Sequence, residues 1–373
     1  MNRIAFLGDY LPRRCGIATF THDLRSAIAE RTGSECIVVP VDDIEGGYDD
    51  DSEVRFQITE QDRESYRRAA DFLNFGSVDV VSLQHEFGIY GGAGGSHVLT
   101  FLRDLRVPVV TTLHTVLPEP NATLRRVMNQ LAELSTRLVV MTERSKAILQ
   151  DAYNISESKI DLIVHGIPDR PFSDPNFYKD QFGVEGKRVG LTFGLLSPNK
   201  GIEQVLMALP AVVQAEPNFV YLVLGATHPS LLRSEGEAYR IGLERMAKDL
   251  GVQKHVIFYN RFVELSELTE FIGAADLYIT PYLNPAQAVS GTLAYSFGCG
   301  QAVISTPYWH AEELLADGRG VLVPFADSTA IGKAIIDLLG DEQRRHAMRK
   351  QAYLLGRKMV WPHVAGLYVE WFQ

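Results

Sequence analysis

The sequence contains few cysteines and no arrangement of them that suggests a disulfide framework. Of its 373 residues only three are cysteine, and none of them forms a C-x-x-C pair: Cys15, Cys36 and Cys299. A sparse and odd set of this kind is typical of proteins from a reducing compartment. We therefore expect a cytoplasmic protein.

Long apolar runs and an excess of basic residues are also missing. No apolar run approaches the roughly 18 residues that a membrane-spanning helix needs. The first apolar stretch, which starts at Arg3, stops at Gly8 and Asp9, too early for the core of a signal peptide. The formal net charge is −10, so no bulk basic field draws the chain to nucleic acid or to anionic lipid. These absences predict no transmembrane segment and no nucleic-acid partner, and they leave open a peripheral place at the inner face of the membrane.

What the chain does contain is an alternation of short apolar strands with amphipathic helices. Apolar residues make up 46% of the sequence and charged residues 22%, which is typical of a globular protein that buries a large core. Apolar runs such as Arg3–Gly8, Val107–Leu113 and Val189–Phe193 are separated by helical patterns. This alternation predicts an α/β fold with parallel, doubly wound sheets.

The alternation occurs twice, on either side of a segment rich in proline and glycine. His165–Asp174 (HGIPDRPFSD) has the composition of a linker. Each half begins with a strand, a glycine, a loop, a second glycine and a helix. We therefore predict two Rossmann-like domains that face each other across a cleft. In such sheets ligands bind beyond the carboxyl ends of the strands, and a cleft between domains is a common small-molecule site.

The segment Thr280–Thr306 (TPYLNPAQAVSGTLAYSFGCGQAVIST) carries the strongest local pattern. An apolar strand ends at Pro281, an irregular stretch follows, and Ser290 is a good N-cap for a helix that ends at Gly298 and Gly300. A helix that opens with Ser-Gly-Thr presents free backbone N–H groups and the positive end of its dipole, which suits a phosphate. An ordinary β-α-β crossover with packing glycines is the alternative, and geometry alone leaves both open.

This segment resembles the donor-site loop of the family 4 retaining glycosyltransferases, which have the GT-B fold and use nucleotide-diphosphate sugars. Their pattern is a strand ending in Pro, two Glu residues eight positions apart around a Gly-containing helix start, and then G-x-P-V. Pro281, Gly300 and Val303 match, whereas the two acidic positions are Gln287 and Tyr295. The resemblance extends over nearly the whole chain.

The segment Phe193–Gly201 (FGLLSPNKG) resembles a second donor-site loop of that family, G-R-x-x-x-x-K-G. Gly194, Lys200 and Gly201 match, and the arginine position is Leu195. A lysine serves as a point charge on a phosphate. The resemblance therefore implies that Lys200 stabilises the donor diphosphate, with one cation where the family normally has two.

Further positions that match the family are spread along the chain. Gly16 lies in the glycine loop that opens the first helix, next to Arg13 and Arg14, either of which is a candidate for the missing arginine. His114 resembles the histidine of the family's cleft floor, so the resemblance implies a catalytic set of His114, Gln287 and Lys200. The implied donor-binding residues are Gly16, Gly194, Gly201, Arg261, Ser290, Gly291, Thr292, Tyr295 and Glu313.

His85 and Glu86 follow another apolar strand, just before the glycine-rich loop Gly88–Gly95. A carboxylate beside a histidine could orient an acceptor hydroxyl or take its proton. A buried ion pair that holds the glycine-rich loop is the alternative. We predict that His85 and Glu86 bind the acceptor.

The resemblance implies a retaining glycosyltransferase that moves a sugar from a nucleotide-diphosphate sugar to a hydroxyl of a carbohydrate or lipid-linked acceptor. It implies an acceptor domain at 1–168, a donor domain at 169–355, and a helix at 356–373 that crosses back to the first domain. The diphosphate would lie between Gly16 and Lys200. No cofactor and no metal is expected, because Asp49-Asp50-Asp51, which imitates a metal-binding D-x-D, is remote from any phosphate-cradling loop. Two alternatives share the fold: a retaining glycoside phosphorylase and a non-catalytic nucleotide-sugar-binding protein.

Overall fold

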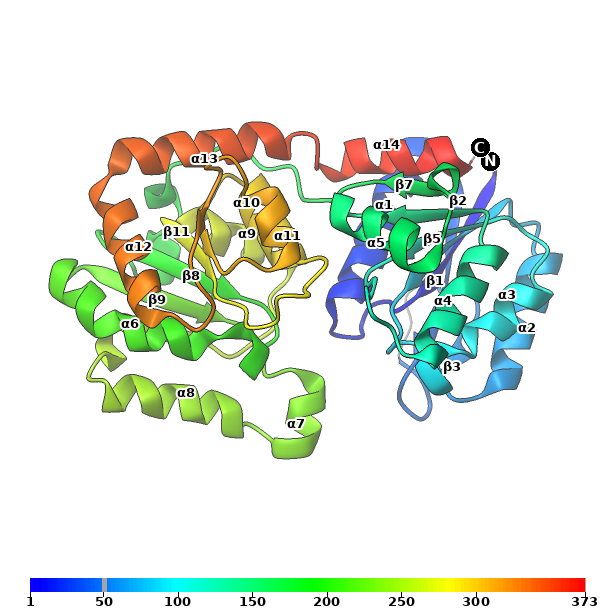
Figure 1. The fold of residues 1–373 in the computed structure, drawn as a ribbon, viewed down its shortest axis with the longest axis horizontal. Coiled ribbons are helices and arrows are strands. Elements are labelled where there is room, and N and C mark those ends of the chain that lie inside the picture. The colour runs from blue at the N-terminus through cyan, green and yellow to red at the C-terminus, as the bar shows by residue number, and fades with distance from the viewer. Residues whose placement is uncertain (49–51, 373) are drawn as a thin grey trace. The chain divides into compact units, whose positions relative to one another are not determined.

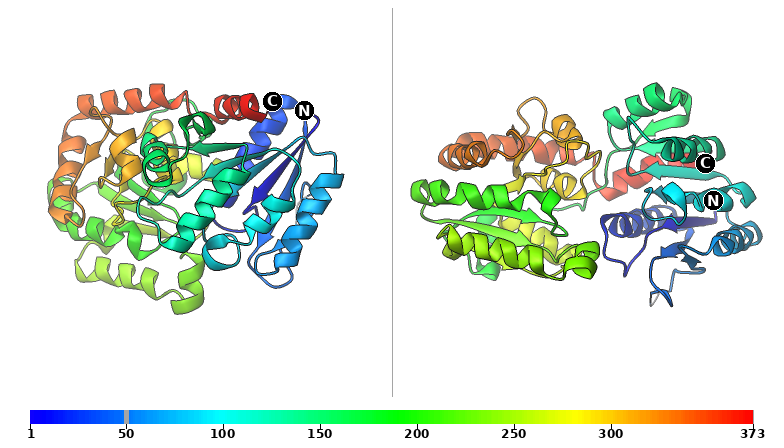
Figure 2. Two further views of the ribbon diagram at one scale, coloured as in Figure 1. Left: turned by 45° about the vertical axis from the view of Figure 1, so that its right-hand side comes forward. Right: turned by 60° about the horizontal axis from the view of Figure 1, so that its bottom comes forward.

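Two all-parallel sheets, each with helices on both faces, make up the protein (Figures 1 and 2). The computed structural model describes residues 1–48 and 52–372, so the D-x-D candidate Asp49–Asp51 lies outside the described residues. The chain forms two units, the first of residues 1–166 with 361–373 and the second of residues 167–360. Our sequence boundaries were 168/169 and 355/356. The α/β prediction with doubly wound parallel sheets is confirmed.

The sheet of the first unit has the strand order β3-β2-β1-β4-β5-β6-β7, and all pairs are parallel. Its strands are β1 (Arg3–Gly8), β2 (Glu35–Asp42), β3 (Ile58–Thr59), β4 (Val80–His85), β5 (Val109–Leu113), β6 (Arg137–Val140) and β7 (Ile160–Leu162). Its helices are α1 (Gly16–Thr32), α2 (Arg63–Phe75), α3 (Val98–Asp104), α4 (Ala122–Leu134), α5 (Glu143–Tyr153) and α14 (Trp361–Phe372).

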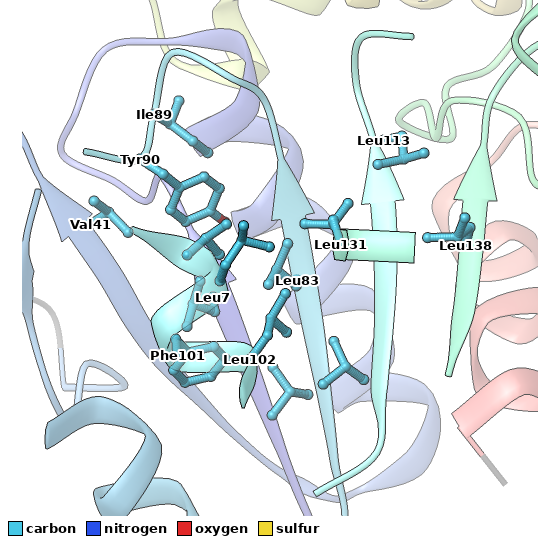
Figure 3. Close-up of a cluster of buried hydrophobic side chains, with 14 of the residues drawn as sticks. Leu7, Val41, Leu83, Ile89, Tyr90, Phe101, Leu102, Leu113, Leu131 and Leu138 are labelled. Atoms are coloured by element: carbon cyan, nitrogen blue, oxygen red, sulfur yellow. The ribbon is translucent and has the colours of Figure 1, made fainter. Parts of the chain in front are cut away.

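Both faces of this sheet are covered, which explains why its strands are almost continuously apolar. On one face, residues of α2 to α5 pack against the strands; Figure 3 shows part of this cluster, including Leu7, Leu83, Leu113, Phe101 and Leu131. On the other face α1 packs beside α14. The C-terminal helix is fixed to the sheet by a buried hydrogen bond of 2.9 Å between Thr112 Oγ1 and Tyr368 Oη.

The sheet of the second unit has the order β10-β9-β8-β11-β12-β13, again all parallel. Its strands are β8 (Arg188–Phe193), β9 (Phe219–Leu224), β10 (Val256–Tyr259), β11 (Leu277–Thr280), β12 (Ala302–Ser305) and β13 (Val321–Leu322). Its helices are α6 (Ile202–Ala215), α7 (Pro229–Glu235), α8 (Ala238–Asp249), α9 (Leu265–Ala274), α10 (Gly291–Gly298), α11 (Trp309–Leu314), α12 (Ser328–Gly340) and α13 (Glu342–Gly356).

Each sheet has one point at which its strand order reverses direction. This switch point lies between β1 and β4 in the first unit and between β8 and β11 in the second. In open α/β sheets the loops that leave the two neighbouring strands diverge at such a point, and ligands bind there beyond the carboxyl ends of the strands. In the second unit the two flanking loops lead from β8 to α6 and from β11 to α10 (Figure 1).

Among residues 1–48 and 52–372, no helix combines the length and the apolar character needed to cross a bilayer.

Candidate functional site

The loops after β8 and β11 are joined at the switch point of the second unit. Leu283 N–H donates to the Asn199 carbonyl at 2.9 Å. Gly201 has a φ of +64°, and a Cβ added there would lie 2.1 Å from the Pro281 carbonyl oxygen. Only glycine permits this approach of the two backbones. The glycine at the end of the G-x5-K-G loop is therefore required by the packing of the two loops.

This approach places Lys200 against a buried tyrosine. The Lys200 Nζ donates a hydrogen bond of 2.7 Å to the Tyr282 hydroxyl and lies 4.0 Å from the centroid of its ring. The ring of Tyr282 in turn stacks on that of Tyr308, with centroids 5.1 Å apart and planes 18° from parallel. The ammonium group is thus held by a hydrogen bond and a cation–π contact on a rigid aromatic pair.

A cluster of hydroxyl groups connects this tyrosine to the start of α10. Thr292 Oγ1 is 2.9 Å from Tyr282 Oη, accepts from Tyr278 Oη at 2.8 Å, and is 3.2 Å from Ser290 Oγ. The methyl of Thr292 faces the first glycine of the other loop, since a Cβ added at Gly194 would lie 3.3 Å from it. The structure therefore brings together five residues that the sequence singled out for the donor: Gly194, Lys200, Gly201, Ser290 and Thr292.

The N-terminus of α10 is capped and fixed. Ser290 is the N-cap, and its hydroxyl accepts from Leu293 N–H at 3.3 Å, as its place in the sequence predicted. The Ser290 N–H donates to His310 Nδ1 at 2.9 Å, which holds the cap from the side of α11. Within the part of the chain that the structure describes, the N–H groups of Gly291 and Thr292 have no hydrogen-bond partner. Such groups are available to an anion.

The electrostatics of the tyrosines reflect their contact with Lys200. Burial acts to raise the pKa of Tyr282, but the charge of Lys200 and the hydrogen bond it donates outweigh burial, so the pKa of Tyr282 is lowered below its usual 10. The pKa values of Tyr278 and Tyr308, which lack such a cation, are raised by burial. Of the three tyrosines, Tyr282 is thus the one whose ionisation depends on the charge of Lys200.

The carboxyl edge of β1 in the first unit carries a different cluster. Arg13 donates to Asp9 Oδ1 at 2.7 Å, and Cys15 Sγ donates to Asp9 Oδ2 at 3.1 Å. Burial raises the pKa of Asp9 to about 6, although Arg13 acts to lower it. Arg13 is therefore engaged within its own loop, whereas Arg14 is exposed and has no ion pair in the described chain. Gly16 faces open space, with no heavy atom within 4 Å of an added Cβ.

Two imidazoles and one indole surround Phe20 at the same edge of the first sheet. The ring of Phe20 lies edge-on to His114, His165 and Trp361, at centroid distances of 4.9, 5.1 and 5.2 Å. His114 Nε2 lies 3.0 Å from the amide oxygen of Gln84, so it is the protonated nitrogen. Burial, with a smaller effect of neighbouring histidines, lowers the pKa of His114 to about 3. At neutral pH His114 is therefore an uncharged hydrogen-bond donor.

His85 and Glu86 do not form the ion pair that was one interpretation of the sequence. Glu86 accepts from its neighbour Phe87 N–H at 2.9 Å and from the Thr115 hydroxyl. His85 is fully buried between Phe87 and Tyr90, and neither ring nitrogen has a partner among the described residues. Burial lowers the pKa of His85 to about 3, so the ring is neutral and cannot pair with the carboxylate.

Across residues 1–48 and 52–372 no three His, Cys, Asp or Glu side chains are grouped so that they could hold a metal ion.

Two family models together match nearly the whole chain. The Glycosyltransferase Family 4 model matches residues 15–170, and the Glycosyl transferases group 1 model matches residues 175–355. The chain belongs to glycosyltransferase family 4.

Relatives of known activity match the family 4 chain at low identity. The GDP-mannose-dependent alpha-(1-6)-phosphatidylinositol monomannoside mannosyltransferase of Mycolicibacterium smegmatis is 27% identical over 243 residues, which are 63% of this chain and 60% of the relative. The lipopolysaccharide glucosyltransferase WaaG of Escherichia coli is 25% identical over 247 residues, 63% of this chain and 58% of the relative. These matches therefore span about three fifths of each relative.

Solved structures confirm the GT-B fold. HepE of Anabaena in complex with UDP superimposes with a TM-score of 0.76 over 99% of both chains, at 18% identity. The sucrose-phosphate synthase of Thermosynechococcus elongatus gives a TM-score of 0.79 over 100% of this chain and 99% of that chain, at 17% identity.

Two departures from the family 4 pattern lie on or beside α10. Gln287 is in the irregular stretch before the helix, where its amide nitrogen donates to the Val289 carbonyl at 2.7 Å. This leaves its amide oxygen as the acceptor that could face a ligand. Tyr295 is only 5% exposed and belongs to the core side of α10. The donor-binding role assigned to Tyr295 stays a prediction.

Two other predicted donor residues lie outside the Lys200 cluster. Arg261 follows β10, at the edge of the sheet, and its guanidinium pairs with Glu267 through two nitrogens. Glu313 is in α11, and its backbone carbonyl accepts from Arg319 at 2.9 Å. Neither has a described hydrogen bond to Lys200, Tyr282 or Thr292.

Three residues of this cluster were not predicted from the sequence: Tyr282, Tyr278 and His310. The available signal was position: Tyr282 is the second residue after β11, behind Pro281, and side chains just after a strand end lie at the carboxyl edge of the sheet. His310 carried no local signal, because its role is a hydrogen bond to a residue 20 positions away.

Proposed function

We propose that this chain is a retaining, metal-independent glycosyltransferase that moves a sugar from a nucleotide-diphosphate sugar to a hydroxyl of a carbohydrate or lipid-linked acceptor. The observation that carries the proposal is the convergence of Lys200 with the unpaired N–H groups of Gly291 and Thr292 at the switch point of the second unit. A cation and helix N–H groups together stabilise the negative charge that develops on a leaving diphosphate.

The side chains around this point fit positioning and electrostatic roles. Tyr282 and Thr292 hold Lys200 beside the helix start, and Gln287 offers an uncharged acceptor to the hydroxyls of the sugar. In the retaining course that we propose, the acceptor hydroxyl attacks the face that the diphosphate leaves, and no protein nucleophile is needed. His114 and Gly16, from the first unit, remain predicted donor contacts.

The names of the relatives support a nucleotide-sugar donor. One relative is named for its use of GDP-mannose, and the solved structure of HepE holds UDP. The mannosyltransferase is named for phosphatidylinositol monomannoside and WaaG for lipopolysaccharide, which favours a lipid-linked acceptor. We place the protein in the cytoplasm because its three cysteines are free, as expected of a reducing compartment.

The test is a turnover assay with UDP-, GDP- and ADP-linked glucose and mannose, with release of the free nucleotide as the readout. The anomeric configuration of the product, followed by NMR, should equal that of the donor. Inversion would contradict retention, and absence of turnover for every donor, hydrolysis included, despite tight binding would identify a sensor. Turnover that requires inorganic phosphate and no nucleotide would instead identify a phosphorylase.

A further inference from the structure

The loops after β8 and β9 continue to pair beyond the ends of their strands. Leu196 N–H donates to the Ala226 carbonyl, and His228 N–H donates to the Leu196 carbonyl, both at 2.9 Å. Leu196 and Thr227 form an isolated parallel bridge. The strand pairing that brings β8 beside β9 thus fixes the backbone of His228 next to Leu195 and Leu196. Leu195 occupies the position at which family 4 normally has its second cation.

The imidazole of His228 is held in one orientation. Its Nδ1 accepts from Ser230 N–H at 3.2 Å and lies 2.7 Å from the Ser230 hydroxyl. A ring nitrogen that accepts from a backbone N–H carries no proton, so neutral His228 has its proton on Nε2. Within the described chain Nε2 has no partner, and it is not among the buried atoms. One oriented N–H donor is therefore open to a ligand.

His228 also lies in the electrostatic field of Lys200. Partial burial lowers its pKa below 6.5, and the charges of Lys200 and Arg233 lower it further. The carboxylate of Glu237, which accepts from the adjacent Thr227 at 2.6 Å, is paired with Arg240 at 2.9 Å. The electrostatic potential at the His228 imidazole is thus set by two cations, Lys200 and Arg233. An anion bound beside Lys200 would act in the opposite sense and raise the pKa of His228.

We propose that His228 is a second phosphate-binding residue of the donor site, which donates a hydrogen bond from Nε2 to the diphosphate held by Lys200 and so takes over part of the role of the arginine missing at Leu195. This inference rests on the proposed function, since it requires a diphosphate at Lys200. His228 is neutral in the free protein and gains a proton more readily once the diphosphate is bound. Recognition at this position therefore strengthens as the pH falls.

The test uses calorimetric titration of the full chain with UDP, GDP and ADP, and with uridine, guanosine and adenosine as probes that lack the diphosphate. His228→Asn is the informative variant, because asparagine retains a side-chain acceptor for Ser230 N–H and loses the outward N–H at Nε2. The variant should bind the nucleotide diphosphate about tenfold to a hundredfold more weakly than the wild type does. This is the range expected for the loss of a hydrogen bond to a charged group. Nucleoside affinity should not change.

Leu195→Arg, added to His228→Asn, should restore at least part of the affinity for the nucleotide diphosphate. If His228→Asn only damaged the local structure, an added arginine would not restore this affinity. Lowering the pH from 8 to 6 should strengthen binding more in the wild type than in His228→Asn; the titration of the ligand itself is common to both and cancels. His255→Asn is the matched control, since His255 Nδ1 bonds the Phe219 carbonyl at the start of β9, the opposite edge of the same sheet.

Unchanged nucleotide affinity in His228→Asn would overturn the role of His228 and leave the donor site intact. An equal loss for nucleotide and nucleoside would also overturn it, because the effect would not depend on the diphosphate. If the wild type binds none of UDP, GDP and ADP, the proposed donor fails, and the role of His228 fails with it.

Discussion

Replacement of Tyr282 by Phe removes one hydroxyl from the proposed donor site and leaves the ring in place. The change deletes the 2.7 Å bond from Lys200 and the 2.9 Å contact with Thr292. It retains the cation–π contact of 4.0 Å and the stacking on Tyr308. The variant therefore isolates the hydrogen bond that orients the Lys200 ammonium.

The expected fall in kcat/KM depends on how far other groups and water replace the hydrogen bonds of the Tyr282 hydroxyl. A hydrogen bond to a charged group contributes about 1.5–3 kcal/mol. Thr292 keeps Tyr278 and Ser290 as partners, and Lys200 is partly exposed, so water replaces some of the loss. We expect the lower limit, about 1.5 kcal/mol, or roughly a tenfold fall in kcat/KM. Lys200→Ala, which removes the charge itself, should cost roughly a hundredfold.

The assay is a double-mutant cycle on kcat/KM with Tyr282→Phe, Lys200→Ala and the double variant. If Tyr282 acts through Lys200, the double variant should be no worse than Lys200→Ala alone. Tyr308→Phe is the matched control, because its hydroxyl bonds Thr280 at 3.2 Å and not Lys200. Additive losses, or an equal loss in Tyr308→Phe, would refute the reasoning.

The same variant has a signature in the pH profile. The pKa of Tyr282 lies below 10, so as pH rises through that value the phenol becomes a phenolate and neutralises the charge that Lys200 presents. Activity of the wild type should therefore fall on the alkaline side before pH 10, and this fall should be absent or moved to higher pH in Tyr282→Phe. Superimposable profiles would contradict the coupling.

Three further outcomes are expected. Gln287→Ala should lower kcat and leave the affinity for free UDP or GDP nearly unchanged, because the proposed contact of Gln287 is to the sugar; an equal loss of nucleotide affinity in titrations would count against this. Turnover should persist in excess chelator, and a complete loss restored by magnesium or manganese would disprove metal independence. Acid should destabilise the first unit: burial lowers the pKa values of His85, His114 and His165 to about 3, about 3 and about 4, so the unfolded chain binds more protons below pH 6.5, while Asp9, raised to about 6, acts in the opposite sense. Three histidines against one carboxyl leave a net loss of about 3 kcal/mol per pH unit between pH 6 and 5, and an unfolding free energy in denaturant that is the same at pH 5 and pH 6 would contradict it.

Elements with a strong local pattern could be predicted from the sequence. The strand Arg3–Gly8 has the predicted bounds, because a strand buried on both faces is a continuous run of apolar residues. Ser290 caps α10 as expected, because an N-cap is recognised from the residues next to it. The short elements β3, α3 and α7 were missed, because their few residues are stabilised by tertiary packing and carry little periodicity of their own.

In the candidate site, too, residues in a local pattern could be predicted, and residues that meet only through the fold could not. Gly201 and Lys200 could be found because a fixed spacing in one loop carries them. The partner of Lys200 could not, because Tyr282 is 82 positions away and meets it only through the order of the strands. The alternative interpretation of His85 and Glu86 as an ion pair does not hold for a related reason: burial makes His85 neutral, and burial is a property of the surrounding chain. The acceptor-binding role of the two residues stays a prediction.

The departures from the family pattern in the proposed donor site compensate one another in charge. The family pattern has two carboxylates and two cations, a sum of zero, whereas this chain has Gln287, Tyr295, Leu195 and Lys200, a sum of +1. The loss of the arginine is therefore offset by the loss of both acids, and in the proposed site a single lysine would face the diphosphate without the two carboxylates of the family pattern. Gln287→Glu should then weaken UDP or GDP binding severalfold, and less so when Leu195→Arg supplies the second cation. The Val289 contact of Gln287 is disturbed equally in both backgrounds and cancels in the comparison. Equal weakening with and without Leu195→Arg, measured by titration, would show that the two positions do not share one bound diphosphate.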